Sequence, residues 1–247
     1  MNAFATQFKI ENKMYARSRD GLFWTLLFPV FFIMLFGLIY GDTTWEDMGL
    51  RAIDYLLPGI IVMALMVTGI MYTAQGFVEE RAKGIYRRVS LTPVSKITIL
   101  AAQLLNRYLL VLAQTVLLLL AGMVVFSVSI AGNWALFFLI LSLGALCFLS
   151  IGFALTGIIR TPSSANAITM IAFFFLMFMG GIFFPVEIMP EALGYVANVL
   201  PSTHLNDAMR VVAIEAGGVG DIGVNAAVVV AWTVGAFALA WKTFRWE

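Results

Sequence analysis

The chain has 247 residues, of which 62% are hydrophobic and 12% charged, and its formal net charge is +1. A soluble domain carries about 25% charged residues, so this composition excludes an ordinary soluble protein. The near-zero net charge also gives no global field that would attract nucleic acid. Residues 108–159 contain no charged side chain, and a helical span needs about 20 apolar residues. We therefore predict an all-α, polytopic integral membrane protein.

Hydropathy predicts six membrane-spanning helices in one transmembrane domain that covers residues 1–247. The predicted spans are Leu22–Tyr40, Tyr55–Val78, Ile97–Val128, Trp134–Ile159, Ser163–Phe184 and Ile222–Trp241. The polar segment Ser127–Asn133 breaks the long uncharged run. Arg107, in the first turns of the third span, is expected to extend its cation to water at the membrane interface.

The positions of the Lys and Arg residues predict the orientation of the spans. Thirteen of them fall in the N-terminal segment, the connection between spans two and three, the turn between spans four and five, and the C-terminal segment. Only Arg51 and Arg210 fall on the other side. Both termini are therefore predicted to be cytoplasmic.

Residues 1–20 predict a basic amphipathic helix that lies in the membrane interface. Phe4 and Phe8 lie on its apolar side, and Lys9, Lys13 and Arg17 lie on its basic side. Glu11 interrupts the apolar side. The alternative is a segment that only fixes the topology by its positive charge. Its charges extend too far for a cleavable signal peptide.

Residues 79–96 predict a short cytoplasmic helix with two apolar side chains and a dense charged rim. Ile85 and Val89 stand at positions i and i+4 and therefore share one face. Thr92 and Pro93 are suited to start the third span. Such a helix suits docking into a cleft of a partner, whereas the alternative is a solvated loop that carries topogenic charge.

The connection over residues 185–221 is too long for a simple hairpin and predicts two short amphipathic helices on the outer side. Pro190 can occupy the first turn of a helix that ends near Leu200. Ser202 can cap a second helix that runs through Glu215. Both helices could cap or re-enter the outer leaflet, where non-helical backbone has to be covered by protein or water.

The sequence lacks the motifs of the enzyme classes that a membrane chain of this kind could represent. It has no G-x-x-x-x-G-K-[ST] loop for ATP phosphates and no G-x-S-x-G nucleophile motif. Its single histidine, His204, and single cysteine, Cys147, exclude a Cys/His zinc site. We therefore predict no catalytic residue, bound cofactor or metal in this chain.

The polar residues predicted inside the spans are neutral, whereas an ion-coupled carrier usually places ionisable groups near the midplane. The energy for transport is therefore expected to come from elsewhere. Met and aromatic residues of spans one, two and five indicate a path for a hydrophobic or amphipathic cargo, although they equally suit lipid contact and core packing. The residues assigned to this path are Phe28, Phe31, Phe32, Met63, Met66, Thr68, Asn166, Met170, Phe174 and Met177.

Two stretches resemble permease subunits of the type-2 ABC exporters. This family includes drug-resistance permeases, polysaccharide and teichoic-acid export permeases, and the membrane halves of ABCG-type transporters. The stretches are EERAKGIYRRVSLTPVSKITILAAQLL at residues 79–105 and LPSTHLNDAMR at residues 200–210. With the six spans and the amphipathic segments, the resemblance covers essentially the whole chain.

The resemblance implies that residues 79–95 form a coupling helix, which seats in a cleft of a separate ATP-binding subunit. The residues implied in this contact are Glu79, Glu80, Arg81, Gly84, Ile85, Arg87, Arg88, Val89 and Pro93. The N-terminal helix would contact the same subunit. The outer helices would close the exit, with a gate formed by Phe184, Pro185, Pro201, His204 and Arg210.

The resemblance also implies a complex of two permease chains, identical or related, with two ATP-binding subunits that bind ATP and Mg²⁺. We predict an exporter in a bacterial inner membrane that moves a hydrophobic or amphipathic drug, antibiotic or lipid outward by alternating access. Membrane lipid and this small molecule are expected partners, and nucleic acid is not. Polysaccharide or teichoic-acid export is the alternative within the family. An ion-coupled secondary transporter is the alternative from another class.

Overall fold

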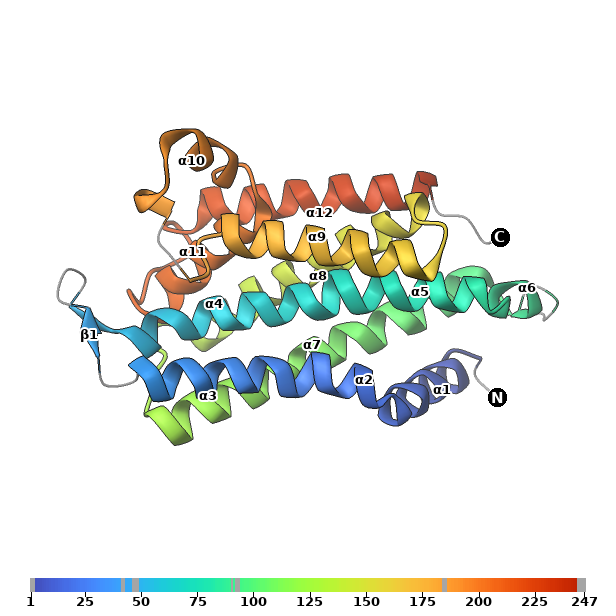
Figure 1. Ribbon diagram of the computed structural model, residues 1–247, viewed down its shortest axis with the longest axis horizontal. Helices are drawn as coiled ribbons and strands as arrows, with labels where there is room; N and C mark the ends of the chain where they lie inside the picture. Colours follow the sequence, from blue (N-terminus) through green and yellow to red (C-terminus); the bar gives the residue numbers. More distant parts are fainter. Residues whose placement is uncertain are drawn as a thin grey trace.

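The computed structural model describes residues 3–40, 43–45, 49–89, 91, 94–183 and 186–243. Long helices run side by side along one axis and form a bundle (Figure 1). Among the described residues, six helices are long and apolar enough to cross a membrane. They are Phe23–Tyr40, Ala52–Ala82, Ile97–Phe126, Trp134–Ile158, Pro162–Met179 and Gly223–Thr243. The prediction of an all-α polytopic protein is confirmed.

The elements follow one another with short connections, and two of the spans contain a π-helical segment. In chain order the helices and strands are α1 (Ala3–Arg17), α2 (Arg19–Leu22), π-helix η1 (Phe23–Leu27), α3 (Phe28–Tyr40), β1 (Thr44–Trp45), β2 (Leu50–Arg51), α4 (Ala52–Met66), π-helix η2 (Val67–Tyr72), α5 (Thr73–Ala82), α6 (Ile85–Val89), α7 (Lys96–Phe126), α8 (Trp134–Ile158), α9 (Pro162–Met179), the 3₁₀ turn η3 (Val186–Ile188), α10 (Glu191–Ala197), α11 (Pro201–Ala213) and α12 (Gly223–Thr243). The two strands pair antiparallel.

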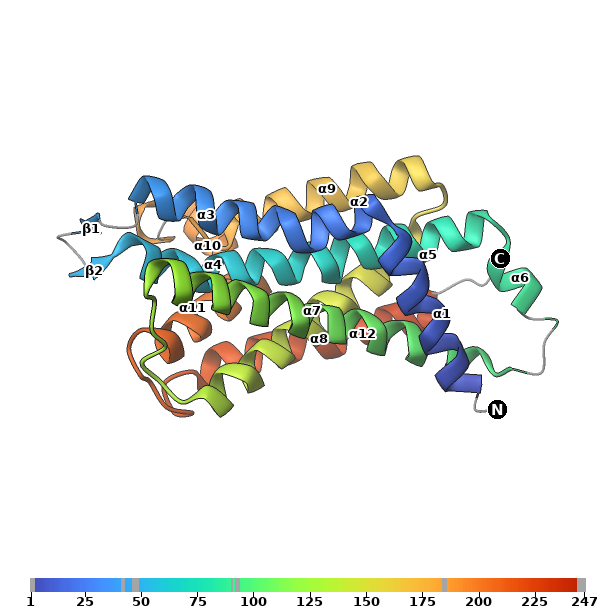
Figure 2. The same cartoon turned by 90° about the horizontal axis from the view of Figure 1, so that it is seen from below.

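The bundle has two distinct ends. Helices α1 and α6 and the last turn of α12 lie at one end, whereas β1, α10 and α11 lie at the other (Figures 1 and 2). We call these the α6 end and the α11 end. The segments that the sequence predicts to be cytoplasmic therefore lie together at the α6 end, and the predicted outer helices lie at the opposite end.

The second span forms the centre of the bundle. Its residues Ile53 and Tyr55–Ile70 are all buried, as expected for a helix that is apolar on every side. Helix α8 packs closely on it because two glycines face each other. A β-carbon added to Gly152 would lie 2.0 Å from the carbonyl oxygen of Gly69. Small residues of this kind let helices approach closely in membranes.

Two predicted boundaries are wrong by four or five residues. The second span continues to Ala82, so Glu79, Glu80 and Arg81 belong to it and the separate helix begins only at Ile85. The fifth span ends at Met179, shortly before Gly181 adopts a φ of 66°. The third span starts at Lys96, one residue before the predicted Ile97.

The third span is capped by Ser95, not by Thr92 as predicted. The hydroxyl oxygen of Ser95 accepts a hydrogen bond from the backbone N–H of Thr98 at 3.1 Å. The predicted residues Pro93, Phe184 and Pro185 lie outside the described residues, as does Thr92. The two predicted outer helices correspond to α10 and α11.

We predict that the close contact between Gly69 of η2 and Gly152 of α8 stabilises the fold. Gly152→Ala forces the two helices apart and should lower the free energy of unfolding by about 1–3 kcal/mol, measured as a lower Tm in detergent. Gly235→Ala on α12 is the control, since nothing lies within 4 Å of its added β-carbon. Equal Tm values for the two variants would contradict this account.

Candidate substrate cavity and coupling site

A cavity of about 640 Å³ lies between the first, second and fifth spans. Aromatic rings and methionines make much of its wall, with several neutral polar groups and one carboxylate among them. Its lining residues are Ser18, Gly21, Trp24, Thr25, Phe28, Val67, Met71, Tyr72, Gln75, Gly76, Glu79, Asn166, Met170, Phe173 and Phe174. Such a wall suits a molecule with a large apolar surface and a few polar groups.

Four of the ten residues predicted for the substrate path line this cavity, namely Phe28, Asn166, Met170 and Phe174. The other six do not. Met63, Met66 and Met177 are buried in the core, and the Thr68 hydroxyl donates to Gln114 at 2.8 Å. Phe31 is exposed on the outside of the bundle, and the Phe32 ring packs on Phe36 and Phe183.

Several wall residues outside the predicted path lie in the two π-helical segments. A π-turn shifts the faces of a helix relative to a regular α-helix, and such turns are frequent at functional sites. Trp24 and Thr25 lie in η1, and Met71 and Tyr72 lie in η2. In the sequence, Pro29 indicates an irregular turn near η1, because proline has no N–H to donate to the carbonyl four residues earlier.

The wall also carries a polar link between the second and fifth spans. The side-chain amide of Gln75 donates to the Thr169 hydroxyl at 2.8 Å and lies 3.4 Å from the Asn166 amide oxygen. Glu79 lies at the same wall and pairs with Lys83 at 2.6 Å. The cavity therefore offers hydrogen-bonding groups on two facing helices.

A buried polar cluster lies at the α6 end and joins four helices. The Gln103 amide nitrogen on α7 donates to Glu80 at 2.6 Å and to Glu11 at 3.1 Å. The Tyr86 hydroxyl on α6 lies within hydrogen-bonding distance of Glu80, at 2.6 Å, and of the Gln103 amide oxygen, at 3.2 Å. We call these four residues the Gln103 cluster. It explains why Glu11 interrupts the apolar side of the N-terminal helix.

Burial raises the pKa of two members of the Gln103 cluster, Glu11 and Tyr86. Burial raises the pKa of Glu11 above 4.5, the nearby charge of Glu80 raises it further, and the Arg107 cation offsets part of the shift. Burial and Glu80 also hold the pKa of the Tyr86 phenol far above its usual value, so the hydroxyl remains a donor. Across the described residues, no group of three or more His, Cys, Asp or Glu side chains could hold a metal ion.

The expectation that Arg107 extends into water is wrong. Its side chain is only 4% exposed, and its guanidinium carbon lies 4.2 Å from the centre of the Phe77 ring and 5.7 Å from that of Tyr72. The absence of a side chain at Gly76 makes room for it, since a β-carbon there would lie 2.9 Å from Nη2. Cation–π attraction and the nearby carboxylates stabilise this buried charge.

Comparison with known proteins identifies the family. The family model described as "ABC-2 family transporter protein" matches residues 48–242. The chain belongs to the ABC-2 family. It is 27% identical to the transport permease YvfS of Bacillus subtilis (strain 168) over 205 residues, which cover 83% of this chain and 82% of YvfS. This membership makes the chain a multi-pass membrane permease of the ABC type, a class of subunit that works with an ATP-binding subunit and is not itself an ATPase.

Two further relatives differ in size. The daunorubicin resistance ABC transporter permease protein DrrB1 of Streptomyces coeruleorubidus is 29% identical over 203 residues, which cover 80% of this chain and 69% of DrrB1. The ABC transporter G family member 20 of Dictyostelium discoideum is 28% identical over 196 residues, or 78% of this chain. The match spans only 27% of that longer protein.

Most residues of the expected coupling motif in this ABC-2 permease make intramolecular contacts. The Arg81 guanidinium donates to the carbonyl oxygens of Thr156 and Ile159, where α8 ends. Gly84 forms the turn between α5 and α6 with a φ of 67°. The exposed charges of α6 itself come from Arg87 and Arg88. Ile85 is half-buried at its start, and Val89 is its last residue.

The N-terminal helix α1 packs across α7 and presents its basic residues to the outside. Phe4 and Phe8 are half-buried, whereas Lys9, Lys13 and Arg17 are exposed. The Tyr15 hydroxyl bonds to that of Thr25, and its ring meets the Tyr72 ring edge-on at 5.4 Å. Helix α1 is therefore connected directly to two walls of the cavity.

The expected gate residues that the structure describes hold α11 in place. The His204 ring nitrogens lie 2.7 Å from Asn225 Oδ1 and 2.8 Å from the Asn198 carbonyl oxygen. The buried Arg210 donates to the Ile182 carbonyl at 3.0 Å. Pro201 is the buried first residue of α11.

We predict that Glu11 makes stability depend on pH. A raised pKa in the folded state means that the protonated form favours folding, so this contribution is present below pH 4.5 and is lost as the pH rises through the raised pKa. Glu11→Gln keeps an acceptor for Gln103 but does not titrate. Its Tm should exceed that of the wild type by an amount that grows from pH 4.5 towards neutrality. Glu215→Gln, at an exposed carboxylate, is the control, and parallel profiles of Glu11→Gln and wild type would refute the assignment.

Proposed function

We propose that this ABC-2 permease exports a hydrophobic or amphipathic small molecule, such as a drug, an antibiotic or a lipid, across a bacterial inner membrane. The observation that carries the proposal is the cavity between the first, second and fifth spans, with its aromatic and methionine-rich wall. The similarity to DrrB1, a daunorubicin resistance permease, supports an apolar cargo and outward movement. Aromatic rings can also stack on sugars, so polysaccharide or teichoic-acid export is the alternative cargo.

In this proposal α6 is the contact for the ATP-binding subunit, which would hold ATP and Mg²⁺. Arg87 and Arg88 are exposed on α6, and Lys9, Lys13 and Arg17 are exposed on α1 at the same end of the bundle. Two permease chains would work with two ATP-binding subunits. The preference of ATP for the closed pair of ATP-binding subunits would supply the energy of the conformational change.

The Gln103 cluster would transmit the movement of α6 to the cavity. Tyr86 of α6 contacts Glu80 and Gln103, and Gln103 contacts Glu11 on α1. Glu80 lies on the same continuous span as the cavity residue Tyr72. A shift of α6 would therefore move α1 and the second span together.

The exposed charges support a cytoplasmic α6 end. Arg160, between α8 and α9, and Lys242, in the last turn of α12, are exposed at this end. Positively charged residues are retained on the cytoplasmic side of membrane proteins. Both ends of the chain would then face the cytoplasm. Carboxylates are the feature that would favour an ion-coupled carrier. The half-buried Glu11 and Glu80 do not line the cavity, and Glu79, which does, is exposed and paired with Lys83.

Reversing the charges of α6 tests the coupling. Arg87→Glu combined with Arg88→Glu should abolish co-purification of the ATP-binding subunit and ATP-dependent transport. The reason is that α6 would present two negative charges to the contact in place of its two positive ones. Arg87→Lys combined with Arg88→Lys keeps both charges and is the matched control. Unchanged partner binding and transport in the Glu variant would contradict the coupling role of α6.

A further inference from the structure

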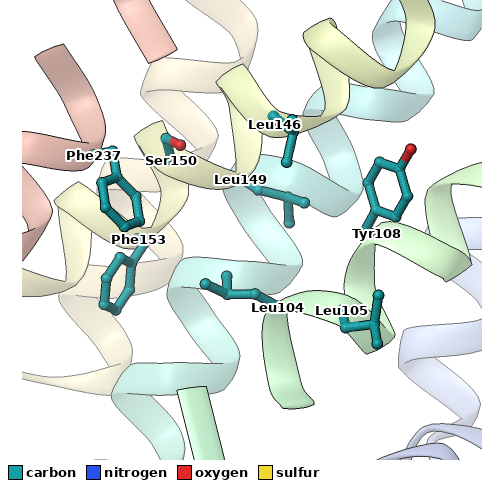
Figure 3. A pocket seen from close by; sticks show the side chains of 8 residues that line it. All are labelled: Leu104, Leu105, Tyr108, Leu146, Leu149, Ser150, Phe153 and Phe237. Atoms are coloured by element: carbon teal, nitrogen blue, oxygen red, sulfur yellow. The ribbon is translucent and has the colours of Figure 1, made fainter. Parts of the chain in front are cut away.

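A second cavity, of about 310 Å³, lies between α7, α8 and α12 and shares no lining residue with the first. Figure 3 shows side chains of these three helices arranged around an open space. Leu149 and Phe153 of α8 are buried and form its floor. Leu105, Leu146 and Phe237 are 39%, 49% and 47% exposed. The cavity is therefore a groove that opens on the side of the bundle.

The groove is almost entirely apolar. Ser150 and Tyr108 are the polar residues of its lining, and the Tyr108 hydroxyl already donates to Ser142 at 2.8 Å. A cavity of this size without several polar partners does not hold ordered water. Its walls belong to membrane-spanning helices, so the medium at its open side is hydrocarbon.

The positions of two cations give the depth of the groove. Phe237 precedes Lys242 by five residues on α12, which is about 7.5 Å along a helix. Phe153 lies five residues, or about 7.5 Å, before the end of α8 at Ile158, and Arg160 follows two residues later. Half of a hydrocarbon core is about 15 Å thick. These distances are shorter than that, so the groove lies in the half of the bundle next to the α6 end, and both cations lie closer to that end than the groove does.

Lys242 lies on α12 and Arg160 follows the end of α8, and these two helices meet at this end. A β-carbon on Gly157 would lie 2.2 Å from the Thr243 hydroxyl, so the last turns of α8 and α12 are in contact. Arg160 and Lys242 are both exposed. One anionic group at the membrane surface could be close to both of them.

We propose that the groove binds one acyl chain of an anionic phospholipid from the leaflet at the α6 end, with its phosphate near Arg160 and Lys242. The main contacts of α12 are with α8 and α11. A chain in the groove would fill the space between α12 and α7 and hold α12 against the bundle. This lipid is distinct from the cargo, because the cargo cavity lies between other spans.

The test is native mass spectrometry of the full chain, purified in mild detergent and titrated with dioleoyl-phosphatidylglycerol. The wild type should retain one lipid per chain. Ser150→Phe fills the groove and should bind about tenfold more weakly, because several buried methylene contacts are lost. Leu139→Phe is the control, since Leu139 is exposed on α8 outside the groove. Equal retention by Ser150→Phe and the control would overturn the proposal.

Two further variants keep the test independent of folding defects. If the Tm of Ser150→Phe falls below that of the control, Leu146→Phe at the exposed rim replaces it, and unchanged retention there overturns the proposal. Lys242→Gln leaves the groove intact and should reduce the preference for dioleoyl-phosphatidylglycerol over dioleoyl-phosphatidylcholine. An unchanged preference would overturn the assignment of the phosphate.

Discussion

The side-chain amide of Gln103 is the interaction on which the α6 end depends. It donates to Glu11 and Glu80, two carboxylates from distant parts of the chain, in a place where water does not compensate for a lost donor. An unsatisfied buried polar group costs about 1–3 kcal/mol, and a charged one more. Tyr86 adds α6 to the same cluster. The N-terminal helix, the second span and the third span are therefore fixed relative to one another.

The same span that carries Glu80 also forms one wall of the cavity between the first, second and fifth spans. Its π-helical segment η2 places Met71 and Tyr72 in that wall, and the Thr73 hydroxyl donates to the Thr68 carbonyl at 2.9 Å within the altered turn. Closely packed glycines fix the other side of η2 against α8. The second span is therefore tightly packed on the side that faces α8 and irregular on the side that faces the cavity. It is suited to move as one body while the residues that line the cavity change position.

Hydropathy alone predicted the spans, because their apolar length decides where they lie. Hydropathy did not predict the partners of Glu11 and Arg107, because it relates each charged residue only to the other residues of its own helix. Their contacts, Gln103 and the Phe77 ring, lie on other helices and become neighbours only in the bundle. Trp24 was not among the residues assigned to the path, because an abundance of Met and aromatic residues does not show which of them face a cavity. The sequence did identify the amphipathic helices at both ends of the bundle.

The most direct test of the account is transport by the complex reconstituted in vesicles, with a fluorescent hydrophobic cargo. Asn166→Trp would fill the cavity, and Phe175→Trp places the same ring on the same helix outside it. We predict ATP-dependent transport that falls at least about tenfold in Asn166→Trp and is retained in Phe175→Trp, as expected when a substrate path is blocked. Transport driven by an ion gradient without ATP, or equal transport by both variants, would contradict the account.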